Sequence, residues 1–408
     1  MLKCEVISIG TELLMGQIVN TDAQYISSRL PECGVGVFYH SVIGDNPGRI
    51  KEALKIGFER CDVVITTGGL GPTQDDLTKE IVADFLGLKL VLDDRSSERI
   101  RKYFEDRGRV LVESNLRQAY FPEGSIIVEN DMGTAPGCIV EKDDKVIVML
   151  PGPPKELIPM FDKVMKYFKE KQLGRLFSKY IRIVGMGESM VEQEIYDIVS
   201  SQTNPTIATY AKDGIVTIRV TASNEGGSNP EVLVNDMVNK ICEILGDNVY
   251  TTENDELEYV VFKLLKERNL KIATAESCSG GVLAQLLTSI PGSSHVFHSG
   301  FVTYSEESKI RALGVERSTI ETYSAVSSQT AREMADGACR KTGCDVGVSI
   351  TGYAGPDGES VGLVYIGVSY GGATEVSEFR FSGNRERIRT MSAVTALDMV
   401  RRTILNKS

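Results

Sequence analysis

The stretch Ala273-Thr-Ala-Glu-Ser-Cys-Ser-Gly-Gly281 joins an apolar run to a run with helical spacing. Residues 270–273 are typical of a short buried strand, and residues 282–287 repeat their apolar side chains at helical intervals. Ser277 therefore lies where a strand becomes a helix. Backbone N–H groups and the positive end of the helix dipole favour a phosphate or a developing oxyanion at such a place. A glycine-rich turn with a capping serine has the same pattern, so other motifs must decide its function.

The composition is typical of a soluble globular protein of two or three domains, with 408 residues, 42% hydrophobic and 25% charged. No apolar run approaches the roughly 18 residues of a membrane span, and no signal peptide precedes the first predicted strand, so we expect a cytoplasmic protein. Eight cysteines without Cys-x-x-Cys and three histidines without His-x-x-x-His disfavour structural zinc and leave few bases for a Ser-His-Asp triad. The net charge of −11 disfavours nucleic-acid binding.

Three segments with different patterns follow one another along the chain. Residues 1–172 alternate strand and helix patterns, which predicts an α/β domain with a parallel or mixed sheet and ligand loops at the carboxyl ends of its strands. Residues 176–250 predict a small α+β domain of KH-like topology. That domain lacks a Gly-x-x-Gly loop and is interpreted as a spacer or dimerisation module. Residues 257–408 predict a second three-layer α/β domain.

Glycines and acidic residues meet in the loop Thr67-Gly-Gly-Leu-Gly-Pro-Thr-Gln-Asp-Asp76. The glycines allow close approach of a ligand, and a helix predicted from Thr73 to Leu86 would direct its N–H groups to the same point. Neither a P-loop nor a Rossmann fingerprint is present. Acids in a first helical turn are also favoured by the dipole alone. We interpret the region as a polyphosphate site beside a divalent metal. The candidate phosphate contacts are Gly68, Gly69, Gly71 and Thr73, with Asn20 and Lys79 assisting, and the candidate metal ligands are Glu12, Asp75 and Asp76.

This loop, with Gly10-Thr-Glu-Leu-Leu-Met-Gly16 and Pro151-Gly-Pro-Pro-Lys-Glu156, resembles the molybdopterin-binding-like domain of the CinA (competence/damage-inducible) family. The Glu-Ser-Cys-Ser-Gly-Gly unit resembles that family's C-terminal nicotinamide-nucleotide amidase domain. The resemblance covers essentially the whole chain, in the family's order. It implies a homodimer with two hydrolase activities that recycle pyridine nucleotides. One is an ADP-ribose pyrophosphatase, which uses Mg, Mn or Co to release AMP and ribose 5-phosphate. The other deamidates nicotinamide mononucleotide (NMN) to nicotinate mononucleotide and ammonia without a cofactor.

Amide hydrolysis needs a nucleophile, a base and a means of holding the substrate. Ser277 is the candidate nucleophile. Lys309 is the candidate base, because a lysine partly desolvated beside a serine has a lowered pKa. The family resemblance points to the same pair and to Tyr304 as a supporting group. Cys278 is the rival nucleophile, but it has no evident histidine partner and is expected to face the core.

Further substrate contacts are predicted at three places in the C-terminal segment. Arg385 and Arg389, one helical turn apart, suit a 5′-phosphate, although surface charge pairing would also explain them. The sequence departs from the usual pattern of the family at two places: the loop at 358–362 is shorter than usual, and Asn384 replaces a common aspartate. The remaining candidates lie in the serine turn and at a strand end: Gly280, Gly281, Thr351 and Gly352.

Three other functions fit the same sequence. The first domain would bind or adenylylate a pterin without turning over ADP-ribose. Alternatively, the whole chain would be a competence-associated interaction protein with little catalysis. A KH-like domain that binds nucleic acid is the third possibility, which the acidic net charge disfavours.

Overall fold

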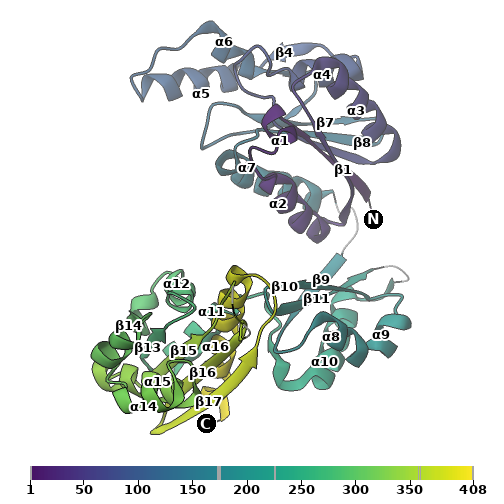
Figure 1. Ribbon diagram of the computed structural model, residues 1–408. Helices are drawn as coiled ribbons and strands as arrows, with labels where there is room; N and C mark the ends of the chain where they lie inside the picture. The colour runs from purple at the N-terminus through teal and green to yellow at the C-terminus, as the bar shows by residue number, and fades with distance from the viewer. Residues whose placement is uncertain (1, 172–175, 225–226, 357, 359, 407–408) are drawn as a thin grey trace. The chain divides into compact units, whose positions relative to one another are not determined.

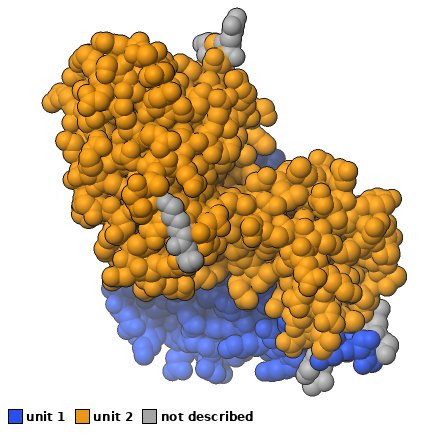
Figure 2. All heavy atoms as spheres, turned by 90° about the horizontal axis from the view of Figure 1, so that it is seen from below, with its two compact units in different colours: residues 1–177, 223–230 blue, residues 178–222, 231–408 orange. Residues whose placement is uncertain are grey.

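The structure is a computed structural model that describes residues 2–171, 176–224, 227–356, 358 and 360–406. The chain divides into two compact units, residues 1–177 with 223–230 and residues 178–222 with 231–408 (Figure 2). Most of the second predicted segment and all of the third thus fall in the second unit. None of the described helices combines the length and the apolar character needed to cross a membrane.

A six-stranded mixed sheet forms the centre of the first unit, in the order β2-β1-β3-β8-β7-β6 (Figure 1). The first four of these strands run parallel, whereas β7 is antiparallel to both of its neighbours. The central strand β3 is buried along its whole length, as expected of a strand covered on both faces. The strands are β1 (Leu2–Ile9), β2 (Val35–Ile43), β3 (Val63–Thr67), β6 (Ile126–Val128), β7 (Gly137–Lys142) and β8 (Lys145–Leu150).

Two pairs of helices cover the two faces of this sheet (Figure 1). Successive strand residues point to opposite faces, so Val63 and Ile65 pack with α2 (Thr21–Arg29) and α7 (Pro154–Glu170), and Val64 packs with α3 (Pro47–Arg60) and α4 (Thr78–Leu86). The other elements of the unit are α1 (Thr11–Leu14), η1 (Leu30–Cys33), β4 (Leu90–Leu92), α5 (Asp94–Glu105), α6 (Glu113–Leu116), η2 (Arg117–Ala119) and β5 (Tyr120–Pro122).

The helix predicted from Thr73 begins only at Thr78, so that prediction is wrong by five residues. The Asp76 carboxylate accepts hydrogen bonds from the Thr73 amide and hydroxyl, and this local bonding competes with a helical turn. The first amide of α4, at Thr78, donates to the Gly69 carbonyl. The glycine-rich loop is therefore tied to the helix start, and that amide is not available to a ligand.

The second unit begins with a four-stranded sheet in the order β10-β11-β9-β12. Alternate residues of β11 are buried, and the apolar side of α10 is buried as well. The elements are β9 (Leu176–Val184), α8 (Glu188–Glu194), α9 (Tyr196–Ser200), β10 (Thr206–Lys212), β11 (Ile215–Ser223), α10 (Pro230–Leu245), η4 (Gly246–Asn248) and β12 (Val249–Thr251).

A five-stranded sheet, β14-β13-β15-β16-β17, forms the rest of the second unit. β14, β13 and β15 are parallel, and β16 and β17 complete the sheet antiparallel. Ile272 of β13 packs with α11, α12 and α16, and the next residue, Ala273, packs with η6, α14 and α15. The strands are β13 (Ile272–Glu276), β14 (Phe297–Val302), β15 (Val346–Gly352), β16 (Leu363–Tyr370) and β17 (Ala373–Arg380). The helices are α11 (Leu257–Glu267), α12 (Val282–Thr288), η5 (Ser293–His295), α13 (Glu306–Ser308), η6 (Lys309–Leu313), α14 (Arg317–Tyr323), α15 (Ser328–Thr342) and α16 (Arg385–Asn406).

The last helix, α16, also joins the two parts of the second unit. The Arg401 guanidinium donates to the Asp247 carbonyl at 2.7 Å, and that of Arg402 donates to Asn248 Oδ1 at 3.1 Å. Both arginines are ion-paired with Asp398 on the same helix. The architecture confirms the predicted fold class: a mixed-sheet molybdopterin-binding-like domain, a KH-like α+β domain and a second three-layer α/β domain.

Candidate active sites

Ser277 and Lys309 lie together in the interior of the second unit. Ser277 directly follows β13, and its amide donates to the Ile350 carbonyl of the neighbouring strand. Lys309 opens the π-helical turn η6, a form of helix that is frequent at functional sites. The Lys309 Nζ is 2.9 Å from Ser277 Oγ and 2.8 Å from the Thr303 carbonyl oxygen. The structure thus brings the predicted nucleophile and base into hydrogen-bonding contact.

Burial sets the chemistry of this lysine. Lys309 is only 2% exposed, and no carboxylate forms an ion pair with it among the described residues. Burial lowers the pKa of the Lys309 amine below its usual value. A neutral amine has a lone pair for the proton of the serine hydroxyl, while one of its N–H groups donates to the Thr303 carbonyl. The geometry and the environment are those of a Ser-Lys pair.

Cys278, the rival nucleophile, faces the apolar core, as predicted. Burial raises the pKa of its thiol to about 11, so the reactive thiolate is scarce at neutral pH. Lys309 donates its described hydrogen bonds to Ser277 and Thr303. These observations favour Ser277 over Cys278.

A carboxylate missed by the sequence reasoning holds the serine turn. Glu276 is 1% exposed, and its two oxygens accept four hydrogen bonds. The donors are the Ser279 hydroxyl and the amides of Gly281, Leu283 and Ala284, at 2.7–3.1 Å. Glu276 therefore occupies amides at the start of α12 that were predicted to be free for a phosphate or an oxyanion. Glu276 does not use the amides of Cys278 and Ser279, which lie at the Cys278 sulfur and are the candidate donors to an oxyanion in this turn.

Gly280 and Gly281 shape this turn, with φ of 61° and 96°, a region that favours glycine. A side chain at Gly280 would lie 3.2 Å from the Arg389 guanidinium, which itself donates to the Ser279 carbonyl at 2.9 Å. Arg385 donates to the Tyr304 hydroxyl at 2.8 Å and to the Gly355 carbonyl at 2.6 Å.

The two predicted arginines therefore lie around the serine turn and Tyr304. Neither Arg385 nor Arg389 is ion-paired with a carboxylate in the part of the chain that the structure describes. Among the described residues, surface charge pairing therefore does not explain these two arginines.

Thr351 and Gly352 end β15, beside β13. Thr351 is fully buried and its hydroxyl donates to the Ala325 carbonyl at 2.7 Å, so this hydroxyl already has a structural partner. A Cβ at Gly352 would lie 2.6 Å from the Leu363 carbonyl oxygen, which indicates close strand packing. The loop at 358–362 includes Glu359, and Asp357 precedes it; both lie outside the described residues.

In the first unit, a cavity of about 520 Å³ lies at the carboxyl ends of the parallel strands. Such a place is where ligands bind in open α/β sheets. Among its lining residues are the predicted site residues Glu12, Asn20, Gly68, Gly69, Gly71, Asp75 and Asp76. The loops of all three N-terminal motifs meet there.

Glycines bring these loops close together. A Cβ on Gly68 would lie 2.1 Å from the Ile9 carbonyl oxygen, and one on Gly69 would lie 2.1 Å from Thr78 Oγ1. Asn20 caps α2 by accepting from the Ala23 amide, and its side-chain amide donates to Ser8. The loop backbone and Asn20 thus have fixed positions at the cavity wall.

The predicted metal ligands do not form a preformed cage. Asp75 and Asp76 are joined through the Thr73 hydroxyl, and this bond lowers the pKa of Asp75. Glu12 lines the same cavity from α1. Among the described residues, no group of three or more His, Cys, Asp or Glu side chains is placed to hold a metal ion.

Lys79 does not line this cavity, but it lines a smaller pocket together with Gly69, Gly71 and Asp76. Its amine donates to the Gln118 carbonyl at 2.5 Å and lies 4.1 Å from the centre of the Phe121 ring. Burial lowers the pKa of Lys79 to about 8. Helix propensity cannot predict the orientation of the Lys79 side chain, because that orientation depends on the packing of residues 118–121 against α4.

Three further carboxylates line the cavity and were not predicted as site residues: Asp22, Asp45 and Glu156. Asp22 is 8% exposed, and its Oδ1 has no hydrogen-bond partner among the described atoms. Burial raises the pKa of Asp22 to about 6. Of these, Glu156 belongs to a motif that carried the family resemblance, Pro151–Glu156, and this was the available signal.

Three family models match successive parts of the chain. A probable molybdopterin binding domain matches residues 5–170, the damage-inducible protein CinA KH domain matches residues 178–251, and the CinA C-terminal domain matches residues 254–404. Among solved structures, a competence/damage inducible protein of Agrobacterium tumefaciens is 39% identical, with a TM-score of 0.35 over 36% of this chain and 92% of that chain.

Relatives of full length are similar along the whole sequence. A CinA-like protein of Dictyoglomus thermophilum is 48% identical over 99% of this chain and 100% of its own. A protein of Acetivibrio thermocellus, named for the competence-damage inducible proteins, is 52% identical over 99% of both chains. The resemblance carried by the sequence motifs is thereby confirmed, and the chain belongs to the CinA family.

Proposed function

We propose that the second unit is an amidase that deamidates NMN to nicotinate mononucleotide and ammonia. The observation that carries this proposal is the buried 2.9 Å contact between Lys309 Nζ and Ser277 Oγ. Membership in the CinA family supports a hydrolytic reaction. The choice of NMN as the substrate rests on the resemblance of the sequence motifs to the family's amidase domain. Arg385 and Arg389, which have no carboxylate partner in the described part of the chain, support a substrate that carries a phosphate.

The reaction proceeds through an acyl-enzyme. The neutral Lys309 amine accepts the Ser277 hydroxyl proton as Oγ attacks the amide carbon, and the amides of Cys278 and Ser279 stabilise the oxyanion. Lys309 then donates this proton to the leaving ammonia. A water molecule attacks the resulting ester, its proton passes to the same amine, and Ser277 recovers its hydroxyl. The Thr303 carbonyl keeps the amine aligned in each step.

Arg385 and Arg389 hold the 5′-phosphate in this proposal. Each guanidinium has five N–H donors, and the described bonds leave several of them free for a phosphate. Arg385 also orients Tyr304, whose hydroxyl lies 2.8 Å from it.

Purified protein incubated with NMN tests the amidase. We expect release of ammonia and nicotinate mononucleotide, loss of at least about a thousandfold in Ser277→Ala and Lys309→Met, and retention in the matched neighbour Cys278→Ala. Activity that survives Ser277→Ala and disappears in Cys278→Ala would assign the nucleophile to cysteine. The absence of ammonia release by the unmodified protein would refute the substrate.

We further propose that the first unit hydrolyses ADP-ribose to AMP and ribose 5-phosphate with a divalent metal. The supporting observation is a single cavity that has both a glycine-rich loop and carboxylates in its wall. Mg²⁺ is usually bound through one or two carboxylates together with substrate phosphates and water. Asp75, Asp76 and Glu12, which line the same cavity, therefore fit such an ion without a preformed cage. When bound, it would neutralise phosphate charge and lower the pKa of water.

The double variant Asp75→Ala/Asp76→Ala tests this second activity. We expect metal-stimulated AMP release to fall to background while amidase activity continues, which shows that the protein remains folded. Tight binding of molybdopterin without any turnover of ADP-ribose would favour the pterin-binding alternative. The predicted homodimer is a separate proposal, which sedimentation of the full chain would test.

A further inference from the structure

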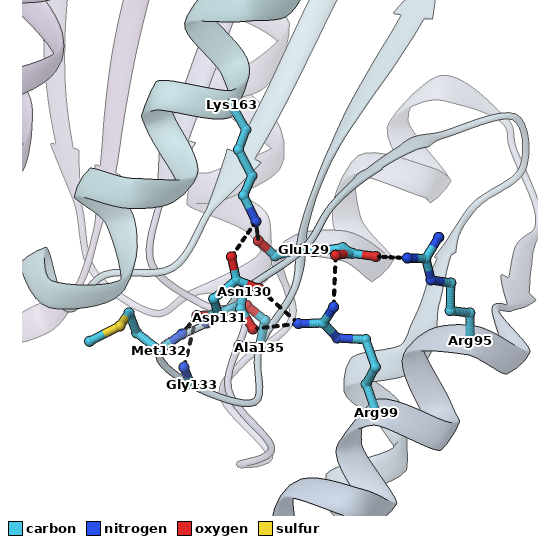
Figure 3. Close-up of polar contacts among 9 residues, drawn as sticks. All are labelled: Arg95, Arg99, Glu129, Asn130, Asp131, Met132, Gly133, Ala135 and Lys163. Carbon is cyan, nitrogen blue, oxygen red and sulfur yellow. Dashed lines mark hydrogen bonds and ion pairs between the residues drawn. The ribbon is translucent and has the colours of Figure 1, made fainter.

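The loop of residues 129–135 leads from β6 towards β7 and is held from outside by three cations (Figure 3). The Glu129 carboxylate pairs with Arg95 and Arg99 of α5, each at 2.7 Å. Asp131 pairs with Arg99 at 2.9 Å and with Lys163 of α7 at 2.7 Å. Exposed ion pairs contribute little one by one, but this network fixes the loop between two helices.

Asn130 fixes the same loop from inside. It is buried, and its Oδ1 accepts hydrogen bonds from the amides of Met132 and Gly133 at 3.0 and 2.8 Å (Figure 3). Its Nδ2 donates to the Ala135 carbonyl at 3.0 Å and to Glu156 Oε2 at 2.6 Å. All the ordinary bonding capacity of this amide is used, and one of its four bonds reaches a carboxylate that lines the cavity.

The backbone of Gly133 also contacts the Glu156 carboxylate. A Cβ at Gly133 would lie 2.2 Å from Glu156 Oε2, so the loop backbone packs directly against it. Among the hydrogen bonds that the structure describes, Glu156 accepts one only through Oε2, from Asn130. One oxygen is therefore pinned, and Oε1 remains for a ligand.

The motif that contains Glu156 is a neighbour of the glycine-rich loop, because the two follow adjacent strands of the sheet. This motif follows β8, and the glycine-rich loop follows β3, the adjacent parallel strand in which Thr67 pairs with Leu150. The Gly68 amide donates to the Leu150 carbonyl at 3.0 Å. A pinned carboxylate and a backbone suited to phosphate thus belong to neighbouring walls of one cavity.

We infer that Glu156 is the general base of the N-terminal site and that Asn130 is its positioning residue; this inference rests on the proposed hydrolysis of ADP-ribose. Glu156 Oε1 accepts a proton from water as the water oxygen bonds to one phosphorus. The bond from that phosphorus to the bridging oxygen breaks, and the second phosphate leaves with the bonding electrons. The products are AMP and ribose 5-phosphate, and Glu156 returns its proton to solvent.

A double-mutant cycle on ADP-ribose turnover tests this inference. Glu156→Gln keeps an oxygen for Asn130 and removes the base, so we expect kcat to fall about 100–1000-fold with KM within threefold. Asn130→Asp keeps the acceptor for Met132 and Gly133 but replaces the donor to Glu156 by an oxygen. We expect it to lower kcat about 10–100-fold alone and less than threefold in the Glu156→Gln background.

Met132→Ala and Lys163→Met are the matched controls, because they change the loop tip or its outer network and leave the Asn130–Glu156 bond in place. Both should keep kcat within threefold, and amidase activity checks that each variant is folded. An unchanged kcat in Glu156→Gln would refute the role of Glu156 as the general base. Additive effects of the two substitutions on kcat would refute the positioning role of Asn130. If the unmodified protein releases no AMP, the proposed function itself fails, a result distinct from either of these.

Discussion

Replacement of Glu276 by glutamine should loosen the serine turn and destabilise the second unit. The Glu276 Oε2 accepts three hydrogen bonds, and Oε1 accepts one from the Ala284 amide at 2.9 Å. Glutamine fits the same space with one oxygen and one NH2 group. In its better orientation it keeps the three bonds to Oε2 and sets its NH2 group against the Ala284 amide.

The size of the effect follows from these four bonds. A hydrogen bond to a charged acceptor contributes about 1.5–3 kcal/mol, a neutral one contributes about 1 kcal/mol, and an unpaired buried donor costs about 1–3 kcal/mol. Relief from burying a charge offsets part of the loss. We expect a net destabilisation of about 2–4 kcal/mol. For a unit of this size it lowers Tm by about 5–15 °C.

Calorimetry and ammonia release together provide the assay. We expect Glu276→Gln to unfold at lower temperature and to lose about 10–100-fold in amidase kcat, because Ser277 is the next residue along the chain. Ser279→Ala removes one of the four donors to the charged carboxylate and should cost about 1.5–3 kcal/mol, while the other three bonds keep the turn in place. A Glu276→Gln protein with unchanged Tm would refute the reasoning, since it would show that a neutral side chain satisfies all four donors equally well.

Three further predictions concern buried ionisable groups. Burial lowers the pKa of Lys309, so the folded protein disfavours its charged form; Lys309→Met should keep or raise Tm at pH 7, measured by calorimetry, while abolishing ammonia release. Burial raises the pKa of Asp22 to about 6, so its ionisation costs stability as pH rises from about 4 to 6; Asp22→Asn should stabilise the first unit by about 1–2 kcal/mol at pH 8 and by almost nothing at pH 4, as measured by urea unfolding. Burial lowers the pKa of Lys79 to about 8 in the folded protein, whereas the unfolded chain keeps this proton up to about pH 10.5. The free energy of unfolding of the first unit should therefore rise between pH 8 and 10. Lys79→Met should flatten that rise in the same urea series.

Local pattern was sufficient for the fold class, whereas the Ser-Lys pair was predicted from local pattern together with the motif resemblance. The alternation of buried strands and helices predicts parallel sheets, and parallel strands bring their carboxyl-end loops together whatever the sequence separation. Ser277 and Lys309 both follow strands that pair in one sheet, β13 and β14, so their meeting is a consequence of topology.

Side-chain contacts between segments far apart in the chain could not be predicted from the sequence. The helix α4 begins at Thr78 and not at the predicted Thr73, because the Asp76 carboxylate accepts a hydrogen bond from the Thr73 amide. Helix propensity does not predict this bond. Lys79 turned to the Gln118 carbonyl, 39 residues away. Asn130 and Glu156 are 26 residues apart, and no periodicity relates them.

The helix α16 has a practical consequence for anyone who divides this protein. Its first turns supply Arg385 and Arg389 to the proposed amidase site, and its last turns donate to the Asp247 carbonyl and to Asn248. A fragment beginning after residue 251 would contain every predicted amidase residue but would leave the far end of that helix without its anchors. The boundary best suited to expressing an amidase fragment therefore lies before residue 178, ahead of the KH-like strands.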